Sequence, residues 1–160
     1  MEEGRYTMTI LSRVMVGLAA VTILTTATAS NASAQEFGVR AGASVDPDQF
    51  YFGAHVETGP LADRIHFRPN VELGVGNDLT AVTVNLEVVY KAPLRRQPWT
   101  FYGGGGPAIN FYDTDRGSDT EGGFNLLGGL EHDKGLFFEV KLGLVDSPDF
   151  KVGIGYVLGR

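Results

Sequence analysis

The chain has 160 residues, a formal net charge of −6 and no cysteine. The length suits a single domain, and the absence of cysteine excludes disulfides, thiolate metal ligands, cysteine nucleophiles and the lipid-modified cysteine of a lipoprotein. The acidic balance argues against a general nucleic-acid binder, since such proteins are normally basic. Mean hydropathy near zero is too polar for a helical membrane protein, whereas a membrane barrel hides half its residues inside and shows no apolar excess.

The first 34 residues have the pattern of a cleaved secretory signal peptide. Arg13 precedes an apolar run over residues 14–24, and a stretch of small residues follows that ends Ala-Ser-Ala at 32–34. The apolar run is shorter than the ~20 residues that a membrane-spanning helix needs, which disfavours the alternative of an anchor. We predict cleavage between Ala34 and Gln35, which leaves residues 35–160 as one exported domain.

From Glu36 onward, apolar and polar residues alternate with a period of two, as in half-buried β-strands, and turn-forming residues separate the alternating segments. We expect a bulge at Pro69, which cannot donate to a ladder, and we expect the longest loop at 113–121. No helical pattern follows residue 34. The predicted strands are 36–44, 50–57, 65–76, 82–91, 99–112, 124–131, 137–144 and 150–158.

Eight strands, most of about nine residues or more, suit a barrel that crosses a membrane, whose strands need ~9–11 residues. Alternation alone also fits a soluble, lipocalin-like barrel with an apolar ligand inside. The aromatic residues favour the membrane barrel, because they fall near both ends of the strands and flank an aliphatic middle, as two membrane interfaces require. The predicted lipid-facing bands are Phe37, Phe67, Tyr90, Trp99, Phe101, Phe138 and Tyr156 at one end, and Phe50, Phe52, Phe111, Phe124 and Phe150 at the other.

The opposite face of the strands mixes glycines with charges of both signs, which fits a narrow lumen in which charges pair. A solvated surface would be denser in charge and poorer in glycine. The predicted polar network of the lumen is Arg40, His55, Glu57, His66, Arg68, Glu72, Glu87, Glu139, Lys141 and Lys151.

The last strand carries Lys151, Gly153, Tyr156 and Leu158 at the spacing polar, glycine, aromatic, hydrophobic. This resembles the C-terminal assembly signal of bacterial outer-membrane β-barrel proteins, although members usually end on the aromatic residue and here the chain continues beyond it. Taken with the strands and the aromatic bands, the mature chain resembles the transmembrane barrel of outer membrane protein A and its single-domain relatives. The resemblance implies an all-β, eight-stranded antiparallel up-and-down transmembrane barrel, with outer-membrane lipid and the barrel assembly machinery as partners.

Three patterns with possible chemistry have simpler structural interpretations. His55 and His66 could face each other across a hairpin and bind a metal ion, but a third ligand is not evident, and a hydrogen-bonded lumen network is preferred. The glycines at 103–106 lack the helix and the Lys-Ser/Thr of a phosphate-binding loop, so we expect close packing or bending of a strand there. The acidic residues at 113, 115 and 119 lack the full spacing of a Ca²⁺ loop. We therefore expect no metal ion and no cofactor.

A lipid A-modifying enzyme is a further alternative, because some small outer-membrane barrels act on lipid A through a His and Ser pair. Ser44, Ser118 and Ser147 fall in or beside loops, and no Ser-His-acid arrangement follows from the spacing. An eight-stranded barrel is also filled by its own side chains and is too narrow for a general pore. The sequence predicts a non-enzymatic outer-membrane barrel with a structural or surface-interaction role and no catalytic residue.

Overall fold

The computed structural model describes residues 35–77, 79–114 and 117–159. The predicted signal peptide lies outside these residues, as does Ala34 of the predicted cleavage site, whereas Gln35 is the first residue described. The described residues contain no helix that is long and apolar enough to cross a membrane.

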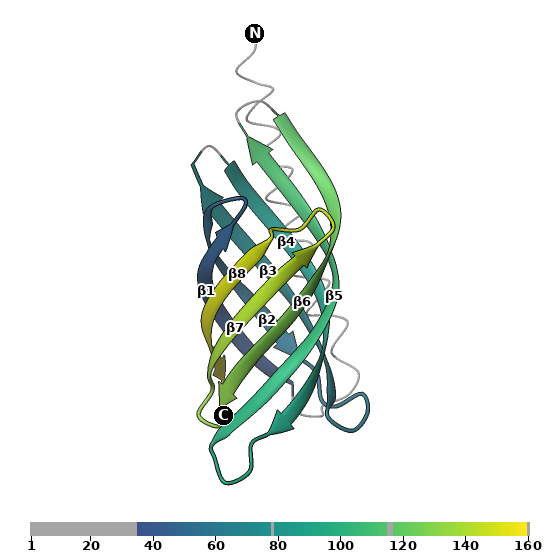
Figure 1. Cartoon of the computed structure of the whole chain (residues 1–160), viewed down its shortest axis with the longest axis vertical. Helices are drawn as coiled ribbons and strands as arrows, with labels where there is room; N and C mark the ends of the chain where they lie inside the picture. The colour runs from purple at the N-terminus through teal and green to yellow at the C-terminus, as the bar shows by residue number, and fades with distance from the viewer. Residues whose placement is uncertain (1–34, 78, 115–116, 160) are drawn as a thin grey trace. The chain divides into compact units, whose positions relative to one another are not determined.

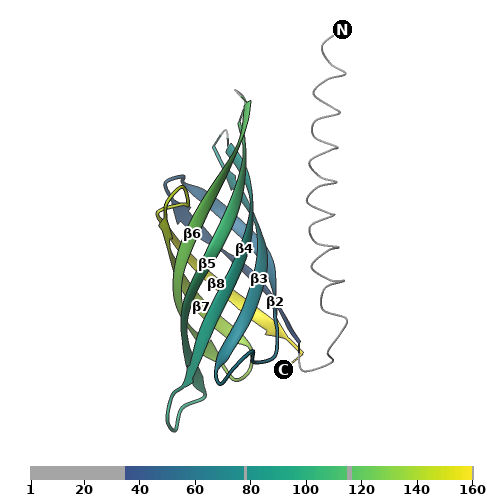
Figure 2. The same cartoon turned by 90° about the vertical axis from the view of Figure 1, so that its right-hand side faces the viewer.

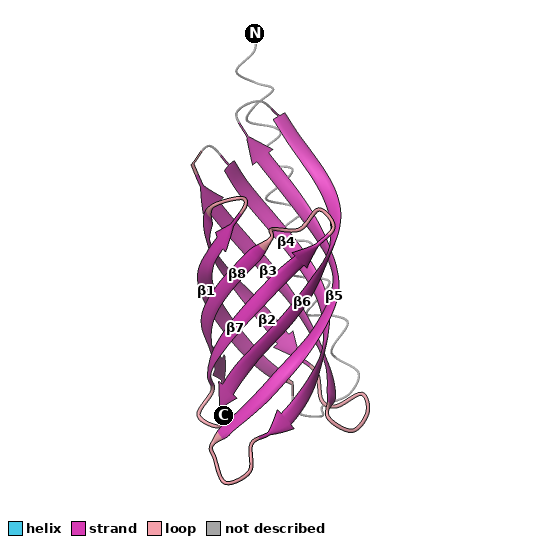
Figure 3. Ribbon diagram, viewed as in Figure 1, coloured by secondary structure: helices cyan, strands magenta, loops and turns pink. Residues whose placement is uncertain are grey.

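Eight antiparallel strands form one closed barrel, in which each strand pairs with its neighbours in sequence and β8 pairs with β1 (Figures 1 and 3). This confirms the predicted all-β, eight-stranded fold. The strands are β1 (Glu36–Val45), β2 (Gln49–Glu57), β3 (Ile65–Gly76), β4 (Leu79–Pro93), β5 (Trp99–Thr114), β6 (Gly117–His132), β7 (Leu136–Leu144) and β8 (Phe150–Leu158).

The barrel has two different ends. We call the end at which β1 begins and β8 finishes the terminal end, and the opposite end, with the connections at 46–48, 77–78, 115–116 and 145–149, the loop end. The strands β4, β5 and β6 have 15, 16 and 16 residues, against nine or ten in β1, β2, β7 and β8. The hairpin of β5 and β6 therefore projects beyond the other strands at the loop end (Figure 2).

The barrel is apolar outside and polar inside. On the outer face, aliphatic side chains such as Val140 (43% exposed) and Ile154 (47%) are open to the surroundings. On the inner face, charged side chains such as Arg68 (0%) and Glu72 (1%) are buried. A soluble barrel with an apolar ligand inside needs the reverse arrangement, so the lipocalin-like alternative does not fit this structure.

The predicted loop at 113–121 is wrong. The strands β5 and β6 continue to Thr114 and from Gly117, and pairs such as Phe111 with Thr120 and Thr114 with Gly117 extend the ladder to its tip. The Thr114 hydroxyl also donates to the carbonyl oxygen of Gly117 at 2.9 Å. Apolar alternation does not reveal these strand ends, because most of the residues at this tip are exposed and backbone pairing does not require hydrophobic residues.

The predicted bulge at Pro69 is also absent. Pro69 lies opposite Leu86 in an unbroken register between β3 and β4, and the ladder of β2 and β3 ends at the pair His55 and Asn70, just before the proline. The interruption lies instead in the ladder of β4 and β5, which stops at Asn85 opposite Ala108 and resumes in the same register beyond Pro107. A proline lacks the N–H that a ladder needs.

Close backbone packing next to this interruption makes Gly106 sensitive to substitution. A Cβ atom at Gly106 would lie 1.9 Å from the carbonyl oxygen of Leu86, whereas a Cβ at Gly128 would meet nothing closer than 3.9 Å. We expect Gly106→Ala to destabilise the barrel by about 1–3 kcal/mol, as overpacking does, and Gly128→Ala to be tolerated. The temperature at which each variant unfolds in sodium dodecyl sulfate measures this. Equal temperatures for the two variants would contradict it.

Candidate functional site

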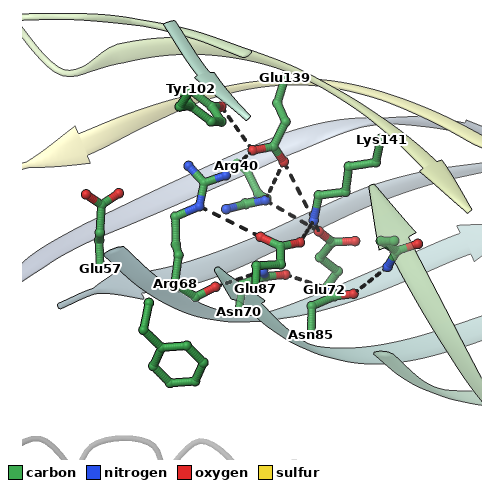
Figure 4. A network of polar contacts seen from close by, with 12 residues as sticks. Arg40, Glu57, Arg68, Asn70, Glu72, Asn85, Glu87, Tyr102, Glu139 and Lys141 are labelled. Atoms are coloured by element: carbon green, nitrogen blue, oxygen red, sulfur yellow. Dashed lines mark hydrogen bonds and ion pairs between the residues drawn. The ribbon is translucent and has the colours of Figure 1, made fainter. Parts of the chain in front are cut away.

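The centre of the lumen holds a compact cluster of buried ions (Figure 4). Glu139 on β7 accepts from Arg40 Nη1 at 2.6 Å and also pairs with Arg68, and the Tyr102 hydroxyl donates to it at 2.9 Å. Lys141 Nζ lies 2.7 Å from a Glu72 oxygen and 2.6 Å from a Glu87 oxygen. These side chains come from β1, β3, β4, β5 and β7, so the cluster ties opposite walls of the barrel together.

Smaller groups extend this cluster. Lys151 on β8 reaches the second oxygen of Glu72 at 2.9 Å. Nearer the terminal end, Lys91 Nζ lies 2.5 Å from Glu57 and 3.2 Å from Glu131. Among the residues that the structure describes, five cations and five carboxylates are buried in the lumen, so these charges balance. They are Arg40, Arg68, Lys91, Lys141 and Lys151 with Glu57, Glu72, Glu87, Glu131 and Glu139.

Three amides bridge the strands on one side of the cluster. The Asn125 side chain donates to Asn85 at 2.8 Å, and Asn85 donates to Asn70 at 2.7 Å. Nearer the loop end, the Asn110 amide donates to the backbone carbonyl of Asp146 at 2.9 Å. These neutral hydrogen bonds satisfy polar groups that would otherwise be costly to bury.

Glycines on the inner face leave space for aromatic rings. A Cβ at Gly153 would lie 2.4 Å from the Tyr51 hydroxyl, and one at Gly155 would lie 2.1 Å from the Phe137 ring. Cations lie over the same rings, with Lys151 Nζ 5.3 Å from the centroid of Tyr51. This explains why the inner face alternates glycine with large residues.

The lumen is closed by these side chains. None of the ten paired ions is more than 7% exposed, whereas side chains that line a water-filled channel would be open to solvent. The central cluster therefore fills and closes the middle of the barrel by ion pairing.

The structure places the predicted lumen residues inside the barrel, with one partial exception. His66 lies near the terminal end with its side chain 19% exposed, and its Nδ1 is 3.1 Å from Glu57. It does not face His55, which is paired with Asn70 and packs edge-on against Phe137 at 5.4 Å. The predicted opposition of the two histidines is wrong. No group of three or more metal-ligating side chains occurs within 35–77, 79–114 and 117–159.

The aromatic residues of the predicted bands lie on the outer face, most of them exposed. Phe67 and Trp99 are half-buried, and Trp99 packs against His132 at 4.7 Å. Phe124 was expected at a strand end, but β6 begins earlier and places it in mid-strand. Phe124 still lies opposite Leu144, the last residue of β7. It is therefore at the same height along the barrel as the ends of the shorter strands.

Sequence reasoning missed several members of the network. Lys91, Glu131, Tyr102 and the three bridging asparagines were not assigned to the lumen network. Their signal was present, because each lies an even number of residues from an inward-facing neighbour on its strand. Glu131, for example, is six residues from Asn125.

A cavity of about 530 Å³ opens at the loop end, between the tip of the β5 and β6 hairpin and the connections at 46–48 and 145–149. Its lining includes Asp119 but not Asp113. Register explains this, because Asp119 is paired with Tyr112 on one face of the hairpin while Asp113 is paired with Ser118 on the other. The predicted acidic group is therefore not assembled by the described residues, and residue 115 lies outside them.

No family model and no curated protein sequence matches this chain. Several solved structures are similar to it, three of them as follows. The N-terminal β-barrel domain of Pseudomonas aeruginosa OprF has 14% identity and a TM-score of 0.62, with 77% of this chain and 94% of that chain covered. Neisserial surface protein A has 11% identity and a TM-score of 0.61 over the same shares. The outer membrane enzyme PagL has 12% identity and a TM-score of 0.51, with 79% and 100% covered. This chain has the closed, eight-stranded antiparallel barrel fold of small outer-membrane proteins.

Proposed function

We propose that the mature chain is an integral barrel of a bacterial outer membrane, with a structural or surface-interaction role and no enzymatic activity. One observation carries the proposal, namely an exposed apolar belt around a charge-balanced, closed lumen. The belt runs around the whole barrel and includes Val39, Leu73, Val88, Leu126, Val140 and Ile154, each 39–47% exposed. Water would not favour such a surface, whereas lipid would.

The loop end is proposed to face outward and the terminal end to face the periplasm. The charges of the connections support this orientation, because Arg64, Arg96 and Lys134 lie in connections at the terminal end, whereas Asp46, Asp146 and Asp149 lie in connections at the loop end. The strand β8, which carries the predicted assembly signal from Lys151 to Leu158, closes the barrel against β1. Recognition of this strand by the barrel assembly machinery is part of the proposal.

The contacts of the histidines favour a non-enzymatic role. His55 packs on Phe137, His66 contacts Glu57, and His132 contacts Asp133 at 2.7 Å. Ser44, for its part, donates to the carbonyl of Pro47 at 2.8 Å. A hydrolytic serine would need a histidine within hydrogen-bond reach and an acid behind it.

The proposal is tested by fractionation of the cell envelope and by electrophoresis of boiled and unboiled samples. Membrane barrels stay folded in sodium dodecyl sulfate until they are heated, because every backbone group of the closed sheet is paired. We expect the chain in the outer-membrane fraction with a mobility that changes on boiling. Recovery as a soluble periplasmic protein without a heat-dependent shift would refute the proposal.

A lipid A profile provides the control for the enzymatic alternative. We expect identical lipid A from cells with and without the protein, compared by mass spectrometry. A change in acyl chains that depends on the folded barrel would replace the non-enzymatic role with lipid modification.

A further inference from the structure

The strand β6 is longer than β7, and this difference leaves part of its edge without a neighbouring strand. The ladder between the two strands begins at Phe124 opposite Leu144, while β6 itself begins at Gly117. Between Asp119 and Gly122, β6 pairs with β5 on one side only, and no described residue continues the sheet on the other. This segment is at the loop end and extends beyond Leu144, the last residue of β7.

The backbone groups of this edge point away from β5. The Thr120 N–H donates to the Asp119 carboxylate at 2.7 Å, so it does not take part in the ladder with β5. Alternate residues of an antiparallel strand direct their N–H and C=O groups to the same side, and Gly122 is two residues further along. The N–H of Gly122 therefore points to the open edge. A Cβ atom at Gly122, which would project from the face of the sheet, would meet nothing within 4 Å.

The acidic cavity borders this edge. Five carboxylate residues line it, namely Asp46, Asp119, Glu121, Asp146 and Asp149, and its described lining contains no Lys, Arg or His. Its volume of about 530 Å³ falls within the roughly 300–1,000 Å³ of ligand sites. Ser147 Oγ, which also lines it, has no hydrogen-bond partner among the described residues.

The charges select the occupant of the edge. A second copy of this chain, paired edge to edge, would bring Asp119 and Glu121 against the same residues of its partner, and like charges on paired strands are destabilising. A strand with Lys or Arg at alternate positions would instead direct its cations into the cavity while its backbone pairs with the edge.

We propose that the β6 edge from Asp119 to Gly122, with the adjoining cavity, binds an extended cationic polypeptide by strand addition. This specifies the partner class of the surface-interaction role proposed above and rests on it. The backbone carbonyls of the bound polypeptide accept hydrogen bonds from the N–H groups of Thr120 and Gly122. A Lys or Arg side chain of the polypeptide replaces the Thr120 N–H as the partner of the Asp119 carboxylate.

The test uses the full mature chain folded in detergent micelles and a fluorescent nonapeptide that alternates lysine with threonine. Binding is measured by fluorescence anisotropy at low and at physiological salt. Gly122→Pro removes the edge N–H, and Gly122→Ala is its matched control, since it adds a Cβ atom in free space and keeps the N–H. We expect Gly122→Pro to weaken binding about tenfold, a loss of the order of one hydrogen bond, and Gly122→Ala to leave it within twofold. Glu121→Gln with Asp149→Asn should weaken binding most at low salt.

Two further peptides keep the test valid even where Gly122→Pro lowers the yield of folded barrel. A peptide that alternates lysine with proline has the same charge but cannot add as a strand, and a peptide that alternates glutamate with threonine has the opposite charge. We expect neither to bind. Equal binding of the lysine–proline peptide, no binding of the lysine–threonine peptide, or dimerisation of the protein through this edge would each overturn the proposal. Because the assay needs only the folded barrel, its failure is distinct from a failure of outer-membrane fractionation.

Discussion

Replacement of Glu139 by glutamine is expected to lower the free energy of unfolding by about 3–5 kcal/mol, the cost of leaving a buried charge without its partner. Glu139 is the shared acceptor of Arg40, Arg68 and Tyr102, and the amide cannot neutralise two guanidinium groups. The lumen of the variant would carry one uncompensated positive charge at its centre. Unfolding by urea in lipid vesicles, followed through the fluorescence of the single tryptophan, Trp99, measures the change.

Asp133→Asn is the matched control for this experiment. The Asp133 side chain is 65% exposed in the turn between β6 and β7 and contacts His132, and an exposed pair of this kind contributes only about 0–1 kcal/mol. A double-mutant cycle that combines Glu139→Gln with Arg68→Met isolates the interaction free energy between these two side chains. A loss at Glu139 no larger than at Asp133 would show that the cluster does not hold the barrel together.

Arginine at Val140 is expected to cost about 2–4 kcal/mol, because the position lies in the middle of the apolar belt, where a charge on the lipid face is most unfavourable. Val140 faces outward on β7 and lies between Gly128 of β6 and Val152 of β8 in the register. The same substitution at Leu144, on the same face and strand but at its end, should cost only about 0–1 kcal/mol. The difference between the two variants is measured by urea unfolding in vesicles.

The comparison between these two variants tests the membrane placement itself. Their side chains are exposed to a similar degree, 43% at Val140 and 45% at Leu144, so a barrel surrounded by water would tolerate both equally. Equal stabilities of the two variants would therefore contradict the proposed bilayer around the belt.

The strand count and the inside-out arrangement were predictable because period-two alternation marks any strand with two different faces. The segment at 150–158, for example, matches β8 residue for residue. The tip of β5 and β6 was not predictable in this way, because most of its residues are exposed and no apolar residue there distinguishes the outward-facing from the inward-facing positions. There the ladder depends on backbone pairing, which leaves no signature in the side chains.

Membership of the lumen network was predictable from strand parity, but its partners were not. Alternation places Glu139 and Arg40 inside, yet 99 positions separate them in the chain. Their contact depends on how the strands tilt and stagger around the closed barrel, which a single sequence does not encode locally. The register of the β2 and β3 hairpin, which the connection between these strands sets, places His55 opposite Asn70 rather than His66.

The long spans of these ion pairs bear on how the barrel can assemble. The closest cation to both Glu72 and Glu87 is Lys141, which is 69 and 54 positions away on the seventh strand. A chain that had placed only its first six strands would hold both carboxylates without that partner. Hairpins that entered lipid one at a time would bring unpaired carboxylates into the bilayer, which is unfavourable in free energy. The network thus makes a partly built barrel unfavourable, and we expect insertion and closure to occur as one cooperative event in which the last strands complete the neutralisation of the first.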